Sequence, residues 1–300
     1  MKMIPLTSGK RQKTNSNIRY RNLNFAFLPT NPIACNYDSL ATIDDNSCTY
    51  PSIDTITIIA IESYIWATNG TEYYATGVYD TTFTNSDGCD SIIYLDLTIL
   101  SSPENLFFSE HAEGSSSNRY LEIYNPNTDT IELTNYALGR VSGTPDNGVG
   151  IYEDWVDFDS GAVILPNDVY IVAHSSADGT IIVEADMTYN SLSNGDDGFA
   201  LMYGINLGTP TAPSNGNYQI LDWIGDWMGD PGQGWTVAGV NSATRNHTLV
   251  RKCAINQGDT SWTNATGTNA INSQWIVLPQ NDWTNIGFHT ICICDSSTNS

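Results

Sequence analysis

The stretch NLFFSEHAEGSSSNRYLEIYN, residues 105–125, predicts a strand, a turn and a second strand. An apolar run at 106–108 opens it, and the Gly, Ser and Asn residues of 113–118 favour a turn. Residues 119–124 then alternate between apolar and other side chains, which is the period-two pattern of a half-buried strand. The alternation assigns its side chains to two faces of the strand, with Leu121 and Ile123 on one and Tyr120, Glu122 and Tyr124 on the other.

The composition favours a β-rich protein with a sizeable core. The chain has 300 residues, of which 40% are hydrophobic and 15% charged, and it contains 16 Tyr and 8 Trp. Aromatic residues at low charge density suit β-sandwiches better than helix bundles. We expect no transmembrane helix, because no run of about 18 apolar residues is present.

The net charge of −22 is distributed unevenly. Six of the eleven basic residues precede Tyr37, and no acidic residue precedes Asp38, so the remainder carries five basic residues against 33 acidic ones, a net charge of −28. Such a body repels phosphate backbones, and we expect no nucleic-acid binding by the folded part. High Asp content with little Lys fits a secreted protein or one that binds Ca²⁺.

The opening stretch also resembles, in wording and in pattern, the first hairpin of the bacterial lamin-tail domain. The usual form of that hairpin reads close to F-S-E-Y-A-E-G-S-S-N-N-K-Y-L-E-I-Y-N, and this chain departs from it at His111. Further stretches resemble the family in the same order: DVYIVAHSSAD (168–178), LSNGDDGFALMY (192–203), YQILDWIG (218–225), HTLVRK (247–252) and the closing segment 275–290. The resemblance implies an all-β, immunoglobulin-like β-sandwich over residues 105–290.

Residues 31–51, NPIACNYDSLATIDDNSCTYP, resemble a short repeat of bacterial surface proteins. The resemblance implies a disulfide between Cys35 and Cys48, which would close a small loop and contribute roughly 3 kcal/mol. Asp38, Asp44 and Asp45 lie within that loop and could bind Ca²⁺ through carboxylate oxygens. The alternative is an acidic solvated turn, because Asp-Asp-Asn is ordinary turn chemistry. We expect no other cofactor.

Residues 53–100 resemble a second repeat of such proteins, a short β-rich module. The first cysteine of that repeat is Ile61 here, so the resemblance implies that Cys89 lacks its usual partner and is a free, buried thiol. The six cysteines suggest disulfides in an oxidising compartment. The pairing of Cys253, Cys292 and Cys294 is left open.

The predicted organisation is modular. Residues 1–30 are a disordered basic leader or, alternatively, a basic arm for nucleic acid or anionic lipid. They are followed by the loop repeat 31–52, the β module 53–100, a linker at 101–104, the sandwich 105–290, and a tail or truncated repeat at 291–300. The N-terminus lacks the apolar segment of a secretion signal. We expect a fragment of a longer extracellular or cell-surface protein.

Catalysis is not expected. Glu110 and His111 suggest acid–base or metal chemistry, but adjacent strand residues face opposite ways. The chain contains no G-x-S-x-G elbow, phosphate-binding loop or H-E-x-x-H motif. The tryptophans are interpreted as core, with a carbohydrate-stacking face as the alternative. The long loops 143–159 and 204–217 are where binding surfaces usually sit.

The function predicted from these features is a non-catalytic binding, adhesion or tethering module of a secreted or cell-surface bacterial protein. Its partner would be an unknown protein or a surface glycan. One alternative is an accessory region of a secreted hydrolase, of nuclease or phosphatase type, whose catalytic domain lies outside this chain. Another is partner-protein or nucleic-acid binding as in lamin tails, which the acidic body disfavours. The neighbouring gene sequence would discriminate between the first two. The oligomeric state is left open.

Overall fold

The computed structural model describes residues 27–84, 89–143, 152–192, 195–205, 218–226 and 229–292. The chain divides into two compact units, residues 1–55 with 80–94, and residues 56–79 with 95–300. The predicted basic leader lies almost wholly outside the described residues, as do most of the tail and long parts of both loops in which binding was expected. The predicted domain boundaries stay predictions.

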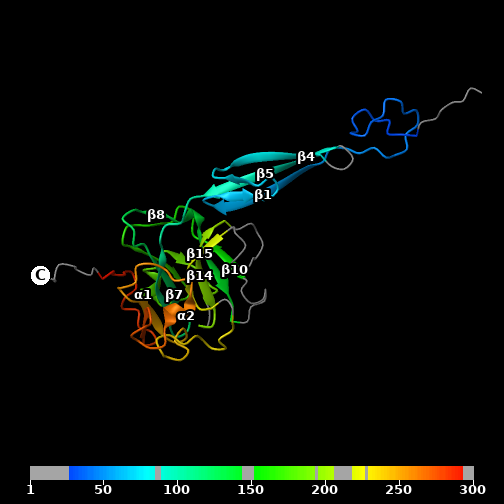
Figure 1. The fold of residues 1–300 in the computed structure, drawn as a ribbon. Helices are drawn as coiled ribbons and strands as arrows, with labels where there is room; N and C mark the ends of the chain where they lie inside the picture. Colours follow the sequence, from blue (N-terminus) through cyan, green and yellow to red (C-terminus); the bar gives the residue numbers. More distant parts are fainter. Residues whose placement is uncertain are drawn as a thin grey trace, which may run out of the picture. The chain divides into compact units, whose positions relative to one another are not determined.

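A small sheet precedes the main body of the fold (Figure 1). Its three strands lie in the order β1-β5-β4, and the boundary between the two units crosses all three of them. Two further short strands, β2 and β3, pair with each other as a separate hairpin. The bounds of these strands are β1 Ile53–Ile61, β2 Tyr64–Trp66, β3 Thr71–Tyr73, β4 Gly77–Thr84 and β5 Asp90–Leu100.

The predicted disulfide between Cys35 and Cys48 is wrong. Cys35 is bonded to Cys89, with their Cα atoms 5.1 Å apart, and Cys48 is a free cysteine. The expectation of a free Cys89 thiol is therefore wrong as well. The reason lies in the backbone pairing, because the Cys35 N–H donates to the carbonyl of Thr49 at 2.9 Å.

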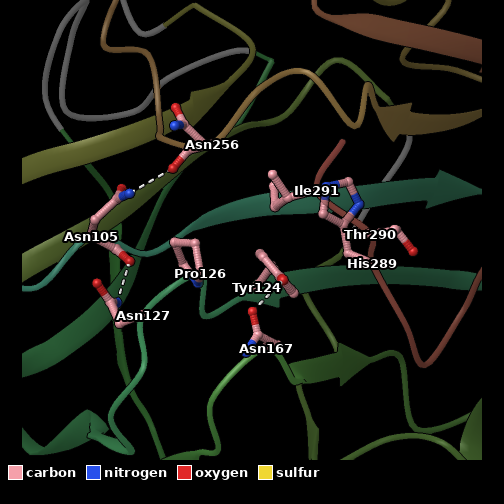
Figure 2. Close-up of a pocket in the computed structure, with 9 residues that line it drawn as sticks. All are labelled: Asn105, Tyr124, Pro126, Asn127, Asn167, Asn256, His289, Thr290 and Ile291. Carbon is pink, nitrogen blue, oxygen red and sulfur yellow. Dashed lines mark hydrogen bonds between the residues drawn. The ribbon is translucent and has the colours of Figure 1, made fainter. Parts of the chain in front are cut away.

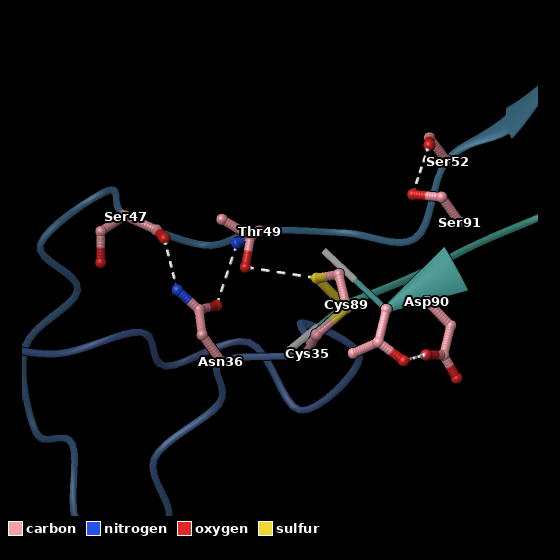
Figure 3. Close-up of a disulfide and its surroundings, with 9 residues drawn as sticks. Cys35, Asn36, Ser47, Thr49, Ser52, Cys89, Asp90 and Ser91 are labelled. Atoms are coloured by element: carbon pink, nitrogen blue, oxygen red, sulfur yellow. Dashed lines mark hydrogen bonds between the residues drawn. A yellow bond between two sulfur atoms is a disulfide. The ribbon is translucent and has the colours of Figure 1, made fainter. Parts of the chain in front are cut away.

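Figure 3 shows that the side chain of Thr49 lies beside the disulfide, and its Oγ1 is 3.4 Å from the Cys89 sulfur. The sulfur of the neighbouring Cys48 instead lies 4.0 Å from Asp44 Oδ1. The Asn36 amide fixes the arrangement by bonding the Ser47 carbonyl at 2.7 Å and the Thr49 N–H at 2.9 Å.

Disulfide mapping tests this pairing. Chymotryptic cleavage after Tyr37 and Tyr50 places Cys35, Cys48 and Cys89 on separate peptides. We expect mass spectrometry without reduction to find the Cys35 and Cys89 peptides joined, and to find Cys48 alkylated in the native protein. A crosslinked pair containing Cys48 would contradict the structure.

The main body is formed by two β-sheets (Figure 1). One has six strands in the order β13-β12-β7-β6-β16-β17, and the other has four in the order β10-β9-β14-β15. The bounds in the six-stranded sheet are β6 Phe107–Glu113, β7 Arg119–Tyr124, β12 Val169–Ala173, β13 Met187–Thr188, β16 Thr248–Arg251 and β17 Trp275–Leu278. Those in the four-stranded sheet are β9 Tyr136–Val141, β10 Asp154–Asp157, β14 Gly198–Gly204 and β15 Tyr218–Ile224.

The remaining elements are short. The two-residue strands β8 and β11 pair with each other, and the helices contain at most five residues. Asp178 and Ser261 cap the helix N-termini by accepting hydrogen bonds from backbone N–H groups of the first turn. The bounds are β8 Ile131–Glu132, β11 Val163–Ile164, the 3-10 helix Leu133–Asn135, α1 Gly179–Ile182 and α2 Trp262–Thr266. The all-β prediction is confirmed.

The predicted hairpin is β6 paired with β7, and its two faces are those that the alternation predicts. Leu121 and Ile123 lie in the main core between the sheets, packed with residues of β9, β14 and β15. Tyr120 lies on the outer face, in a second cluster with Ile171 and Ile181 that the α1 segment covers. The six-stranded sheet is therefore buried on both faces along this hairpin.

No helix in the described part of the chain is long and apolar enough to cross a membrane.

Candidate binding site

Each carboxylate predicted to bind Ca²⁺ accepts hydrogen bonds from its own turn. Asp38 Oδ1 accepts from the N–H two residues on at 2.8 Å, and Asp44 Oδ1 does the same at 3.0 Å. Asp45 Oδ1 accepts from the hydroxyl and the N–H of Ser47, and these bonds lower the pKa of Asp45. Among the described residues, no three His, Cys, Asp or Glu side chains are grouped to hold a metal ion. The Ca²⁺ site stays a prediction.

Calcium binding by this loop has a measurable consequence. A site formed by Asp38, Asp44 and Asp45 predicts that Ca²⁺ protects the loop amides from hydrogen exchange and that a chelator removes this protection. At a free ion concentration about 100 times the dissociation constant, the stabilisation is about 2.7 kcal/mol. The Asp44→Asn/Asp45→Asn variant should lose the effect. Identical exchange with Ca²⁺ and with chelator would contradict the site.

A solvent-open pocket of about 570 Å³ lies where several strands of the six-stranded sheet begin or end. Four asparagines line it together with Tyr124, Pro126 and the segment 289–291 (Figure 2). The four asparagines are Asn105 before β6, Asn127 after β7, Asn167 before β12 and Asn256 after β16. None of the described residues that line it is Asp, Glu, Lys or Arg, so these residues offer polar groups without formal charge.

Backbone carbonyls fix the orientation of two of these amides, because only the NH₂ group of an asparagine can donate to a carbonyl. Asn105 donates through Nδ2 to the carbonyl of Asn256 at 2.7 Å, and Asn127 donates to the carbonyl of Asn105 at 2.9 Å (Figure 2). Their Oδ1 atoms, the Asn167 NH₂ group and the whole Asn256 side-chain amide have no partner among the described residues. These groups are available to a ligand.

Asn125, the last residue of the opening stretch, holds two of the pocket loops in place. Its buried Nδ2 donates to the carbonyls of Ile164 at 3.0 Å and Leu165 at 3.1 Å, just before Asn167. Its Oδ1 accepts from the side chain of Asn127 at 2.8 Å. One buried amide therefore positions the loops that carry Asn127 and Asn167.

The C-terminal segment 289–291 forms one wall of the pocket. The His289 ring packs edge-on against Tyr124 and Phe107, with centroid distances of 4.9 and 5.8 Å. Burial and the nearby Arg251 charge lower the pKa of His289 to about 4, so the ring is neutral near pH 7. Its Nε2 is buried without a hydrogen-bond partner among the described residues.

A disulfide between Cys253 and Cys292 ties this segment to the end of β16, with the two Cα atoms 4.9 Å apart. The Cys292 N–H also donates to the Cys253 carbonyl at 2.7 Å. The bond settles a pairing that the sequence left open, while Cys294 lies outside the described residues. Because Asn256 follows Cys253 closely, the disulfide holds two walls of the pocket together.

A second polar cluster lies on the outer face of the six-stranded sheet. Glu110 and Glu122 are cross-strand partners in the β6–β7 pair, and both are buried. Glu110 accepts from the Tyr120 hydroxyl at 2.6 Å, and Glu122 accepts from Ser109 Oγ at 2.7 Å and from the Gly287 N–H at 2.8 Å. Burial raises the pKa of Glu110 to about 8 and that of Glu122 to about 7.

His111 does not join this cluster. It pairs with Leu121 across the hairpin, and because directly opposed residues of paired strands lie on the same face, it faces the main core as Leu121 does. The prediction that Glu110 and His111 face opposite ways is confirmed. Burial lowers the pKa of His111 to about 4, and the ring is neutral there.

The tryptophans that the structure describes in this body are core or partly buried residues. Trp262 and Trp275 are buried in the main core, and Trp235 packs against them at its edge. Trp283 packs on the outer cluster and donates to Thr180 Oγ1 at 3.1 Å. The core interpretation is confirmed for Trp262 and Trp275, whereas Trp235 and Trp283 are only partly buried and Trp227 lies outside the described residues.

Sequence reasoning missed the asparagine pocket. Its four amides are separated by up to 151 positions, and each one reads as an ordinary strand-end residue. The available signal was that Asn105 and Asn125 bracket the opening stretch, while Asn127 and Asn167 stand beside other strand termini.

Comparisons with known proteins bear on the main body. A family model described as Lamin Tail Domain matches residues 100–217. A solved structure, a DUF4876 family protein from Bacteroides thetaiotaomicron, aligns with 83% of this chain and 98% of its own at a TM-score of 0.35 and 11% identity. No curated protein sequence matches the chain. The lamin tail domain is a non-catalytic, immunoglobulin-like β-sandwich family, and residues 100–217 of this chain are similar to it.

Proposed function

We propose that this chain is a non-catalytic binding and tethering module of a secreted or cell-surface bacterial protein. The observation that carries the proposal is the asparagine-lined pocket at the strand ends of the sandwich. Its volume of about 570 Å³ falls in the range of small-molecule sites, roughly 300–1,000 Å³. Binding sites commonly lie on loops that a rigid scaffold positions, as these loops are.

The chemistry of the pocket supports binding rather than turnover. General acid–base catalysis needs a group whose pKa lies near the working pH, and the one imidazole that lines the pocket has a pKa of about 4. The carboxyls with pKa values near neutrality, Glu110 and Glu122, are buried elsewhere, beside the segment that contains Asp282 and Gly287. The pocket offers amide donors and acceptors, which hold a ligand without activating it.

The disulfides support an oxidising compartment. Cys35–Cys89 and Cys253–Cys292 lie in different units, and each joins segments that are distant in sequence. Such bonds persist in secreted and surface proteins and are rare in the cytosol. The net charge of −22 also supports a location in the aqueous medium outside the cell, because a high net charge favours solubility.

A binding assay on cell envelopes tests the proposal. We expect the fluorescently labelled full chain to bind intact bacterial cells or isolated envelopes saturably, and the unlabelled chain to compete. Incubation with phosphate-ester, glycoside and nucleic-acid substrates should give no turnover. Turnover by the purified chain, or the absence of saturable envelope binding, would overturn the proposal.

A further inference from the structure

The asparagine-lined pocket selects against charged ligands. Among the residues that the structure describes, its lining contains no cationic side chain for phosphate, sulfate or carboxylate, and no carboxylate for a cation. The nearby Arg251 is fully buried and already hydrogen-bonded to Asp222, Gln274 and the Phe108 carbonyl. A ligand that fits this pocket is therefore neutral and polar.

The unpartnered groups of the pocket match hydroxyl groups. Asn105 and Asn127 each leave a carbonyl oxygen, Asn167 leaves an NH₂ group, and Asn256 leaves both. A hydroxyl both donates and accepts, so neighbouring hydroxyls on one ring can bond to acceptors and donors held side by side. Pro126 and Ile291 contribute apolar surface to the lining for the C–H groups of such a ring.

The pocket is also organised before any ligand binds. Asn125 fixes the loops of Asn127 and Asn167, and the Cys253–Cys292 disulfide fixes the segment that ends at Ile291. Preorganised groups lose little conformational freedom on binding, which favours small polar ligands.

From these observations we propose that the asparagine-lined pocket binds a neutral saccharide unit, as the recognition site of the tethering function proposed above. An uncharged peptide is the competing ligand class. Extended peptides bind along the exposed edges of sheets with pockets for their side chains. This pocket instead lies at the ends of inner strands such as β6 and β7, and most of its lining residues have polar side chains.

The test is an NMR titration of the full chain labelled with ¹⁵N. The probes are methyl glucoside, galactose, mannose and N-acetylglucosamine, with a Gly-Ser-Thr peptide as the alternative ligand. We expect at least one sugar to shift the side-chain NH₂ signals of Asn256 and Asn167 saturably. A single ring is expected to bind with a dissociation constant on the order of 1 mM. If no sugar moves these signals, or the peptide moves them at lower concentration, the proposal is wrong.

Two variants make the titration specific. Asn256→Ala removes an exposed amide that has no partner among the described residues, and we expect about tenfold weaker sugar binding. Asn167→Asp keeps the acceptor for the Tyr124 hydroxyl and tolerates the positive φ of 56°, yet it removes the donor and adds a charge. The matched control is Asn264→Ala, an exposed asparagine of α2 outside the pocket, and it should bind as the unmodified chain does. Unchanged affinity in Asn256→Ala would overturn the assignment.

The envelope assay separates this inference from the proposed function. Envelope binding that Asn256→Ala and Asn167→Asp leave intact would refute the saccharide pocket and leave the tethering function standing. Sugar binding in the titration without envelope binding would refute the tethering function and leave the pocket standing.

Discussion

Replacing Asp222 with Asn is expected to destabilise the β-sandwich by roughly 3–5 kcal/mol, because the change leaves Arg251 as a buried charge without its counter-ion. Asp222 lies on β15 of the four-stranded sheet and Arg251 on β16 of the six-stranded sheet, and both side chains are fully buried. The pair therefore joins the two layers of the sandwich. Urea unfolding followed by tryptophan fluorescence measures the loss, and hydrogen exchange in β6 and β16 assigns it to this unit.

The pair also replaces backbone bonding at an interruption in the sheet. The register of β6 against β7 shifts between Phe108 and Glu110, and β16 pairs with β6 only from Glu110 to Ala112. At this point the Phe108 N–H donates to Asp222 Oδ2 at 2.8 Å, and the Phe108 carbonyl accepts from Arg251 Nε at 3.0 Å. The guanidinium also lies over the Trp275 ring, 4.0 Å from its centroid.

This role predicts an unusual result for the apolar double variant Asp222→Leu/Arg251→Leu. Replacing a buried ion pair with hydrophobic residues is often neutral or stabilising. Here it should leave the domain destabilised, because the Phe108 backbone and the Asp259 N–H, 2.9 Å from Asp222 Oδ1, lose their partners. Full recovery of stability would contradict this account. Asp230→Asn, the same change at an exposed aspartate, should alter stability by less than about 0.5 kcal/mol.

Local periodicity predicted the main body well, because successive side chains of a strand alternate between its two faces and the sequence alternates with them. The alternation at 119–124 placed Leu121 and Ile123 in the core and Tyr120 on the outer face, as the structure has them. It did not predict that the outer face is buried too. That burial depends on the α1 segment and residues near Trp283, which reach the sheet only through tertiary packing.

Features that depend on distant partners were not predictable from local pattern. The pairing of Cys35 followed from resemblance to a repeat, whereas its actual partner, Cys89, is 54 residues away and is brought there by the strand β5 that follows it. The ion pair of Asp222 and Arg251 spans 29 positions, and it joins the stretches 218–225 and 247–252, whose local patterns do not indicate that they meet. Sequence spacing carries no information about such contacts until the sheet order is known.

The stability of the domain is expected to fall as the pH rises from about 5 to about 9, and the buried pair Glu110 and Glu122 is the expected cause. Burial raises the pKa of Glu110 from 4.5 to about 8 and that of Glu122 to about 7. Between these values and 4.5 the folded state binds more protons than the unfolded chain, so stability decreases with pH. The stabilisation that these two groups contribute is highest below about pH 4.5 and is lost as the pH passes through 7–8.

The packing around Glu110 explains why its protonated form fits the fold. Its Oε1 accepts from the Tyr120 hydroxyl, while its Oε2 is buried with no hydrogen-bond partner among the described residues. The negative charges of Glu122 and Asp282 further disfavour its ionisation. Burial and the Glu110 charge also raise the pKa of Tyr120, which therefore stays a hydrogen-bond donor at neutral pH.

Glu110→Gln is expected to stabilise the folded protein at high pH, whereas most substitutions of buried residues destabilise it. Gln is neutral at every pH and keeps an oxygen for the Tyr120 hydroxyl, so the variant should match the unmodified protein near pH 5 and exceed its stability by roughly 2–4 kcal/mol near pH 9. Urea unfolding at a series of pH values measures both curves. Glu132→Gln, at an exposed carboxylate of β8, controls for removing one charge from a chain of net charge −22. If the curves of the two variants run parallel, the pH dependence arises from general charge repulsion and not from the buried pair.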